Sequence, residues 1–448
     1  MADNDPEIYR FPTNPSSEQD PVVISGIGIG ASVGSTRESV WKAIQSGRSG
    51  IRRTYAGDHV GSLRLPCGMV DWLPEEHHKI KSVQLSEVAA EEAIEDAGID
   101  WSTVARERFA CSISTQFGDI DYLYMDPSVR NQVPFPEGER KWWDQFLPSS
   151  ASRIIAEKFG LHGPRLCHAT ACASGLVSTI AAARMIEEGQ ADYALCGAAD
   201  AVHELILASF YRMGVLADDE EPSGACRPFD VNRKGFVMGE GAAMMILERR
   251  SQALARGATV YAELAASATL CQAHHVTGLD GAAETLTYLI QRIVSKAGWD
   301  YRGPQYINAH GTGTEQNDRS ELKAIRSGLG DLADQVLVSS NKACLGHLIN
   351  AAGSIELALT AMALRDGFAP PTMHLEHPEK EGHLDCLAEY GVQAELDRAL
   401  KLSLAFGGHL VGIALRRCPL KELQRNPQPL APSARIRQTD RQVVRRAA

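Results

Sequence analysis

CASGLVSTIAAARMIEEG at residues 172–189 and NAAGSIELALTAMALRDG at residues 350–367 are alike in length and pattern. Each stretch begins with small residues, is rich in alanine on every face, and ends in charged residues followed by glycine, which is typical of a helix C-terminus. A helix that is apolar all round is buried. The likeness therefore predicts a duplicated fold in which two buried helices cross closely at the centre, with chance similarity as the alternative.

Short apolar runs alternate with helical patterns around these two stretches, which is typical of an α/β fold. Predicted strands include residues 21–25, 109–114, 193–196, 306–309, 336–339 and 402–404. Both ends of the chain are polar: the composition predicts a flexible acidic lead over 1–20 and a mobile basic tail over 419–448. The aromatic and proline-rich residues 119–145 are interpreted as an insertion, either a packed loop or a surface that faces a substrate or partner.

The overall composition excludes several function classes. The chain has 448 residues and a net charge of −11, which argues against nucleic-acid binding through a basic surface. No apolar run is long enough to span a bilayer, and MADNDPEIYR lacks a secretion-signal pattern, so we expect a soluble cytoplasmic protein. The ten cysteines include no CxxC pair, which predicts reduced thiols and no metal site.

The glycine-rich stretch VVISGIGIGASVG resembles a dinucleotide-binding turn, because Gly26, Gly28 and Ala31 satisfy GxGxxA. Such a site also needs an acidic residue about twenty positions later to hold the ribose. The corresponding segment, WKAIQSGRSGIRR, contains no acid. The pattern therefore does not predict a nicotinamide cofactor.

Cys172 stands at the start of the first buried helix, after the approach LCHATA. Free N–H groups and the helix dipole at that position favour a thiolate, and the same N–H groups can hold an oxyanion. Taken alone, such a cysteine is more often inert than catalytic. Two further segments change this interpretation: INAHGTGTEQND contains His310, and SSNKACLGHLINAAG contains Lys342 and His347. Together they predict a Cys–His–His set at the centre of the molecule.

TACASG, RPFDVNRKGFVMGEGAAMMILE (residues 227–248), NAHGTGT and NKACLGHLINAAG resemble the elongating β-ketoacyl-[acyl-carrier-protein] synthases, close to type II. The segments have the order and spacing of that family, over about residues 22–417. The resemblance implies the thiolase fold, in which two similar halves form five layers in the order α-β-α-β-α. The halves would be residues 21–265 with the nucleophile and 266–418 with the two histidines. It also implies a homodimer, with a heterodimer as a second possibility.

The resemblance also implies a reaction. Cys172 would accept an acyl group from an acyl-loaded carrier protein, and a malonyl-loaded carrier would then lose CO2. The resulting enolate would attack the acyl-cysteine and give a 3-ketoacyl thioester. His310 and His347 would donate N–H bonds to the developing enolate oxygen. Lys342 would organise the site, in a pair with Glu356.

Further roles come from the same resemblance. Backbone N–H groups of Cys172 and Leu404 would form the oxyanion hole, and the side chains of Leu404 and Phe406 would gate the acyl pocket. Thr312 and Thr314 would bind the phosphopantetheine arm, with simple turn hydroxyls as the alternative. That arm belongs to the carrier, so no bound cofactor or metal is expected.

Some positions depart from the family pattern. Family members commonly have Phe-Gly-Phe-Gly-Gly-Thr-Asn where this chain has LAFGGHL at residues 404–410. We expect a smaller gate at Leu404, a stiffer turn at Ala405, and the loss of an Asn hydrogen bond at Leu410. Gln272 replaces a usual acid ahead of His275. These changes favour a specialised synthase, in secondary metabolism or unusual lipid assembly.

Alternative functions remain at this stage. They are a catalytically silent subunit of a ketosynthase heterodimer, a thiolase or chain-initiating synthase, another thiolase-fold acyltransferase or decarboxylase, and a cysteine hydrolase. The retained Cys172, His310 and His347 argue against the silent subunit. Candidate basic residues for an acidic carrier are Arg52, Arg53, Arg64, Lys79 and Lys81, with a solvated face as the simpler explanation.

Overall fold

The computed structural model describes residues 20–55, 64–74, 79–115, 145, 147–388 and 390–418. The predicted lead (except Asp20), the predicted tail, and the segment 119–145 (except Gln145) lie outside the described residues. Gln145 is buried, and its Oε1 accepts a hydrogen bond from the N–H of Ile80. Within the described ranges, no helix combines the length and apolar character needed to cross a membrane.

The main sheet of the described chain is built from two halves with the same strand pattern. In each half the successive pairings are antiparallel, antiparallel, parallel and parallel. The first half has the order β1 (Val22–Ala31), β8 (Gly241–Arg249), β6 (Tyr193–Asp200), β4 (Phe109–Ser114) and β5 (Arg165–Leu166). The second has β9 (Ala262–Cys271), β16 (His409–Arg416), β15 (Arg398–Ala405), β10 (Tyr306–Asn308) and β11 (Leu337–Ser339), with β13 (Asp385–Cys386) at its edge.

The halves join where β1 pairs with the start of β9. Apolar runs on both faces of these strands, such as the fully buried β1, are typical of sheets covered on both sides. The predicted boundary at 265/266 falls inside β9, the first strand of the second half. The exact residue at which the chain divides into its two halves stays a prediction.

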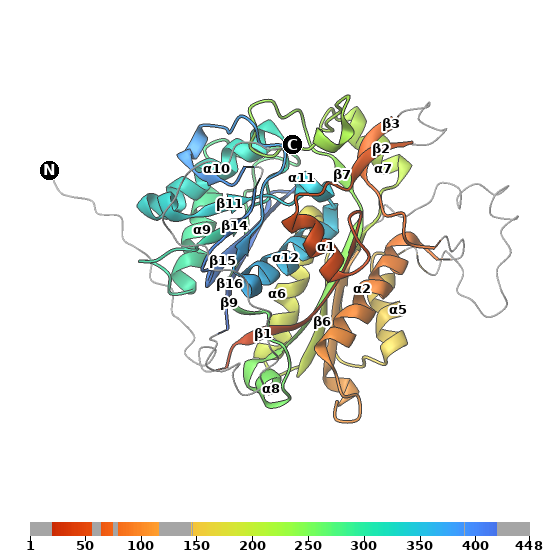
Figure 1. Cartoon of the computed structure of the whole chain (residues 1–448). Coiled ribbons are helices and arrows are strands. Elements are labelled where there is room, and N and C mark those ends of the chain that lie inside the picture. The colour runs from red at the N-terminus through yellow and green to blue at the C-terminus, as the bar shows by residue number, and fades with distance from the viewer. Residues whose placement is uncertain are drawn as a thin grey trace, which may run out of the picture. The chain divides into compact units, whose positions relative to one another are not determined.

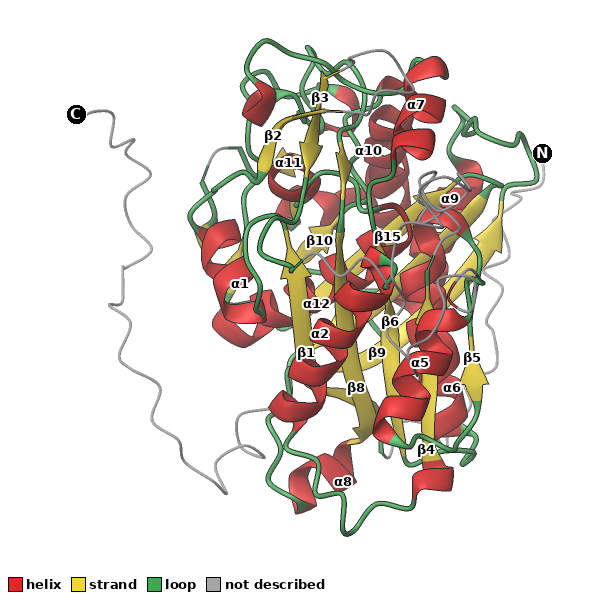
Figure 2. Cartoon of the chain, turned by 90° about the vertical axis from the view of Figure 1, so that its right-hand side faces the viewer, coloured by secondary structure: helices red, strands yellow, loops and turns green. Residues whose placement is uncertain are grey.

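Helices form the other three layers (Figure 1). α6 (Ser174–Glu187) and α12 (Ala352–Asp366) lie between the two halves of the sheet. α2 (Lys81–Ala97) and α5 (Ser150–Phe159) cover the outer face of the first half, where α2 lies over β1 and β8 (Figure 2). α9 (Glu284–Lys296) and α10 (Glu315–Leu329) cover the second half. The five-layer, duplicated arrangement expected from the sequence is therefore present.

The two central helices cross where each has a glycine near its start. A Cβ added to Gly175 would overlap the side chain of Ser354, and one added to Gly353 would lie 3.0 Å from Cγ of Leu176. Every residue of α12 from Ala352 to Leu364 is buried. The prediction of a close crossing between two buried helices is confirmed, and small residues at the crossing are its physical cause.

The same strained turn precedes both central helices. Ala171 and Ile349 have φ values of 46° and 44°, in the left-handed region that residues other than glycine rarely adopt. Each stands one residue before the position that begins its quoted stretch, Cys172 and Asn350, in the short 3-10 turns Ala171–Ala173 and Ile349–Ala351. The duplication thus extends to the backbone of the turn that carries Cys172.

Shorter elements complete the described fold around this core. They are the helices α1 (Arg37–Gln45), α7 (Glu204–Arg212), α8 (Arg250–Ala255) and α11 (Lys342–Leu345), and the short strands β2 (Ile51–Tyr55), β3 (Arg64–Gly68), β7 (Met238–Gly239), β12 (Phe368–Ala369) and β14 (Val392–Gln393). Several predicted strands extend beyond the predicted limits, β1 and β15 most clearly, because apolar burial continues along them. α11 positions Lys342 and leads to the turn that carries His347.

Candidate active site

Cys172 lies in the 3-10 turn that leads into α6, with its side chain buried. Its Sγ lies 3.2 Å from Nε2 of His347, within hydrogen-bond reach for sulfur. His347 comes from the turn before α12, 175 residues further along the chain. The segments that lead into the two central helices therefore bring the thiol and the imidazole together from the two halves of the fold.

His310 lies two residues after the end of β10 (Tyr306–Asn308), and its ring contacts the ring of His347 edge to face. The ring centroids are 5.2 Å apart and the planes are inclined by 84°. Phe236 packs on His347 in the same way, with centroids 5.4 Å apart. Cys172, His310 and His347 thus converge on one point, as the sequence predicted.

This point opens into a cavity of about 500 Å³. The cavity is lined by all the predicted contact residues of the carrier arm and gate, namely Thr312, Thr314, Leu404 and Phe406, together with the Cys–His–His set. The Thr312 and Thr314 hydroxyl oxygens are 2.8 Å apart and hydrogen-bonded to each other. Both threonines therefore line the same cavity as Cys172.

Lys342 and Glu356 lie behind the histidines, both fully or almost fully buried. The Nζ atom of Lys342 lies 2.6 Å from Oε1 of Glu356, as predicted for this pair. The same Nζ donates to the carbonyl oxygen of His310 at 2.6 Å and lies 3.4 Å from its Nδ1. An ammonium group facing Nδ1 makes that atom the acceptor, which leaves Nε2–H as the donor of a neutral His310 ring.

A second buried lysine, which our sequence interpretation missed, lies next to this pair. Lys401 is fully buried in β15, and its Nζ lies 2.6 Å from Oε2 of Glu356. Glu356 therefore binds one lysine with each carboxylate oxygen. A single lysine in the apolar run RALKLSLA was the available signal, since a lysine inside a central strand must find a partner.

Two buried carboxylates of α10 hold the turn that carries His310; they too were missed. Glu321 accepts hydrogen bonds from the N–H groups of His310 (2.6 Å) and Gly311 (2.7 Å). Asp318 accepts from the N–H groups of Thr312 and Gly313. Burial raises the pKa of Glu321 to about 7, while its two backbone hydrogen bonds act in the opposite direction. α10 thereby fixes the backbone from which His310 and Thr312 project.

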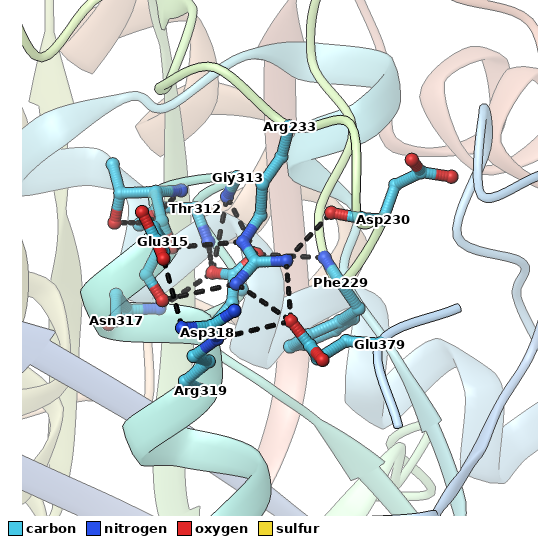
Figure 3. Close-up of polar contacts among 12 residues, drawn as sticks. Phe229, Asp230, Arg233, Thr312, Gly313, Glu315, Asn317, Asp318, Arg319 and Glu379 are labelled. Carbon is cyan, nitrogen blue, oxygen red and sulfur yellow. Dashed lines mark hydrogen bonds and ion pairs between the residues drawn. The ribbon is translucent and has the colours of Figure 1, made fainter. Parts of the chain in front are cut away.

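Arg233 completes the support on the outer side of this turn (Figure 3). Its guanidinium donates to Glu379 at 3.3 Å and forms a longer ion pair of 3.7 Å with Asp318. Asp318 also accepts from the N–H of Phe229, which ties the RPFDVNRKG segment to α10 (Figure 3). This explains why that segment accompanies the histidine motif although it contains no reacting group.

The electrostatics of the site favour neutral histidines. Burial, and after it the charge of Lys342, hold the pKa of His310 and of His347 well below the usual range. Both rings can therefore serve as hydrogen-bond donors near neutral pH without carrying charge.

The same burial overturns one expectation, the resting thiolate at Cys172. Desolvation raises the pKa of its thiol to about 12, and the charge of Lys342 lowers it only in part. The sulfur is therefore a neutral thiol at rest, and Nε2 of His347 is placed to take its proton during attack. Helix position alone suggested ionisation; the tertiary environment outweighs it.

Residues 71–253 match the family described as Beta-ketoacyl synthase, N-terminal domain, and residues 261–376 match Beta-ketoacyl synthase, C-terminal domain. The chain belongs to the β-ketoacyl synthase family. Over 417 residues it is 35% identical to the tetracenomycin polyketide synthase ketoacyl synthase alpha subunit of Streptomyces glaucescens. The matched region covers 88% of this chain and 97% of that relative.

Other similar proteins agree. The β-ketoacyl synthase is 35% identical over 405 residues to 3-oxoacyl-[acyl-carrier-protein] synthase 2 of Vibrio cholerae, across 86% of this chain and 96% of that protein. Its fold also matches one chain of a solved complex, described as a type II polyketide synthase acyl-carrier protein in complex with its ketosynthase. The TM-score is 0.81 and the sequence identity is 30%, and the match covers 89% of this chain and 100% of the matched chain. The predicted thiolase fold and the acyl-transferring condensation reaction are confirmed.

Ala405 does not stiffen the LAFGG turn of this synthase, contrary to the expectation from the sequence. Ala405 is the last residue of β15 and has no positive φ, whereas Gly407 and Gly408 do, at 84° and 77°. The conformational freedom is needed at those two glycines, so alanine at 405 imposes no strain. Leu410 is fully buried in β16, where an apolar side chain packs without a polar partner.

Phe406 lies at one end of an aromatic row that leads back to the histidines. Phe406 and Phe210 have ring centroids 6.3 Å apart, and Phe210 and Phe236 have centroids 5.3 Å apart. Phe236 in turn contacts His347. Phe406 is half-buried whereas Leu404 is buried, so Phe406 has more room to move.

Gln272 and His275 lie at a neighbouring turn of the synthase. Nδ1 of His275 accepts hydrogen bonds from the N–H groups of Thr277 (3.1 Å) and Gly278 (3.0 Å), which line the cavity. Oε1 of Gln272 is buried and has no hydrogen-bond partner among the described residues. The side chain of His275 thus holds the turn, whereas Oε1 of Gln272 contributes no hydrogen bond to it.

Most of the candidate basic residues for the carrier are engaged in ion pairs. Their partners are acidic side chains: Asp71 for Arg52, Asp218 for Arg53, Glu87 for Lys79, and the buried Glu240 for Lys81. Arg64 is exposed. This pairing favours the simpler explanation, a solvated and largely neutralised face. Within the described part of the chain, no three metal-ligating side chains are grouped in a way that could hold an ion.

Proposed function

We propose that this synthase elongates carrier-bound acyl chains, with Cys172 as nucleophile and His310 and His347 as the donors that stabilise the enolate. The observation that carries the proposal is the convergence of these three side chains on one cavity, with 3.2 Å between Sγ of Cys172 and Nε2 of His347. Lys342 and Glu356 organise the site from behind.

The first half-reaction transfers the acyl group to the enzyme. The Cys172 sulfur attacks the thioester carbonyl carbon while its proton passes to Nε2 of His347, which is neutral because of its lowered pKa. The tetrahedral intermediate then expels the carrier's pantetheine sulfur, which takes that proton. The products are acyl-Cys172 and the free thiol of the carrier.

The second half-reaction forms the new carbon–carbon bond. The malonyl thioester loses CO2, and the electron pair of the broken bond moves onto the thioester oxygen, where Nε2–H groups of both histidines donate. The enolate carbon attacks the acyl-Cys172 carbonyl, and the sulfur leaves and takes up a proton from solvent. Removing one oriented donor of this kind costs about 100- to 1000-fold in rate.

His347 must accept a proton in the first half-reaction and donate one in the second. Its Nδ1 is buried and has no hydrogen-bond partner among the described residues. No fixed tautomer is therefore imposed on this ring, in contrast to His310, whose Nδ1 faces Lys342. We infer that His347 changes tautomer between the two half-reactions, with one ring nitrogen taking up a proton from solvent that enters the cavity and the other releasing one to it, which suits the ring to both tasks.

Backbone N–H groups of Cys172 and of the turn after Leu404 would hold the oxyanion. Leu404 lies in the paired part of β15, opposite Leu410, whereas Phe406 is the first residue beyond the strand. The N–H of Phe406 lies outside the β15–β16 ladder. We therefore propose it, in place of the N–H of Leu404, as the second donor of the oxyanion hole. The side chains of Leu404 and Phe406 would gate the acyl chain. Thr312 and Thr314 would bind the pantetheine arm.

The partners and setting follow from the family. We propose acyl- and malonyl-loaded carrier proteins as substrates, whose phosphopantetheine arm supplies the thioester, with no resident cofactor required. The similarity to a polyketide ketosynthase alpha subunit and to a 3-oxoacyl-carrier synthase supports a cytoplasmic enzyme of a specialised polyketide or fatty-acid pathway. We propose a homodimer, with a ketosynthase heterodimer as the alternative.

Intact-mass measurement tests this function. The full chain is mixed with carrier proteins that carry straight, branched or aryl acyl groups, and we expect an acyl adduct on the wild-type enzyme that Cys172→Ala abolishes. Cys271→Ser, which removes an exposed thiol outside the cavity lining, is the matched control and keeps the adduct. An adduct that persists in Cys172→Ala would refute the assigned nucleophile, and an ordinary long-chain profile would refute the specialised pathway.

A further inference from the structure

Lys401 is a charged residue in the interior that the reaction described above does not use. It lies in register with Asn308 of β10, and no part of its side chain is exposed. Its Nζ lies 2.6 Å from Oε2 of Glu356 and donates to the carbonyl oxygen of Ala309 at 3.1 Å. A buried ammonium group is costly unless partners replace its water, and here a carboxylate and a carbonyl do so.

Lys401 and Lys342 are arranged as a pair around Glu356. Each lysine takes one carboxylate oxygen, both at 2.6 Å. Each also takes one of two consecutive carbonyl oxygens, that of Ala309 for Lys401 and that of His310 for Lys342. The two lysines therefore fix the backbone carbonyl groups of Ala309 and His310, just after the end of β10.

We propose that Lys401 is a positioning residue for the condensation: it neutralises one oxygen of Glu356, so that Lys342 stays against His310 and both histidines stay neutral donors. This inference rests on the roles proposed for His310 and His347. Without Lys401, Oε2 of Glu356 would be a buried anionic acceptor without a cation. Lys342 would then be drawn between both oxygens, away from Nδ1 of His310.

The charges around Lys401 agree with this role. The ionisable groups that face it are Glu356 from α12, Lys342 from α11, Glu321 from α10, and the two histidines. Among its effects, the positive charge of Lys401 lowers the pKa of both histidines. Burial lowers the pKa of Lys401 itself to about 8, against the pull of Glu356. Lys401 is therefore charged below about pH 8 and loses its charge above it.

The first test is decarboxylation of the N-acetylcysteamine thioester of malonate by the full chain. We expect Lys401→Met to lose about 10- to 100-fold in rate at pH 7, the range observed when a residue that orients a metal ligand is removed. The wild-type rate should fall above about pH 8, and this fall should be absent in Lys401→Met. Leu402→Ala, a buried neighbour whose side chain points to the other face of β15, is the control for lost volume and should keep the wild-type rate per folded molecule.

The second test uses Lys401→Ala, which leaves a space between a carboxylate and a carbonyl oxygen. We expect ammonium chloride to raise both its decarboxylation rate and its melting temperature, relative to tetramethylammonium chloride at equal ionic strength. The wild-type enzyme should respond equally to the two salts. A Lys401→Met enzyme with the wild-type rate and pH profile, or a Lys401→Ala enzyme indifferent to ammonium in both readouts, would overturn the proposal. Melting does not depend on catalysis, so a wild-type enzyme that fails to decarboxylate would refute the proposed function while this readout still tests Lys401.

Discussion

At the scale of single residues, the two histidines of the site are held differently and should fail differently. His310 has its Nδ1 against Lys342, whereas Nε2 of His347 lies against the sulfur of Cys172. We predict that His310→Ala slows decarboxylation by about 100- to 1000-fold but leaves acylation of Cys172 largely intact. His347→Ala should impair both steps. Separate assays of adduct formation and of CO2 release check this, and equal losses in both assays for His310→Ala would contradict it.

The buried thiol gives a second prediction at this scale, a pH dependence. Because desolvation raises the pKa of Cys172 to about 12, its reactive thiolate is a small fraction at neutral pH and grows as pH rises. In a Cys271→Ser background, alkylation of Cys172 by iodoacetamide should still be accelerating at pH 10, where a free thiol has already levelled off. Lys342→Met should slow it further, since Lys342 lowers that pKa. A rate that levels off below pH 8 would instead indicate a resting thiolate.

At the scale of elements, the sequence predicted what depends on local pattern. Alanine on every face and small residues at the start identified both central helices, and the histidine and cysteine motifs identified the three side chains that converge on the cavity. Lys401 was missed because it acts on groups that only the tertiary fold brings close, such as a carbonyl 92 residues earlier in the chain. Glu321 and Asp318 hold N–H groups only 5 to 11 residues away, but nothing in the polar helix sequence EQNDRSELK distinguishes a buried carboxylate from an exposed one. The resting thiolate was wrong for the same reason, because burial is a property of the whole fold and not of the helix start.

The crossing of α6 and α12 yields a prediction for an element. Gly175→Ala places a Cβ against Ser354 of the partner helix, where both backbones are fixed by burial. We expect a loss of about 1–3 kcal/mol in the free energy of unfolding, the usual cost of overpacking a core. Gly281→Ala, whose Cβ would meet nothing within 4 Å, is the matched control and should be near neutral. Urea denaturation of both variants measures the difference, and equal stabilities would show that the helices can move apart.

At the scale of the whole molecule, the proposed homodimer has a natural site at the end of the sheet. β5 is the terminal strand of the first half, and both its residues, Arg165 and Leu166, are exposed. An exposed edge strand pairs readily with another strand, and this one lies seven residues or fewer before Cys172. Pairing there would couple association to the position of the nucleophile.

Sedimentation of the full chain at micromolar concentration tests this association. We expect a mass of twice 48.6 kDa for the wild-type enzyme and a shift toward 48.6 kDa for Leu166→Lys, because a lysine on an edge strand opposes strand pairing. Tyr301→Lys, at a site 96% exposed and outside the sheet, is the matched control and should remain a dimer. A wild-type chain that sediments at 48.6 kDa would instead favour the heterodimer, since the β5 edge would then await a different subunit.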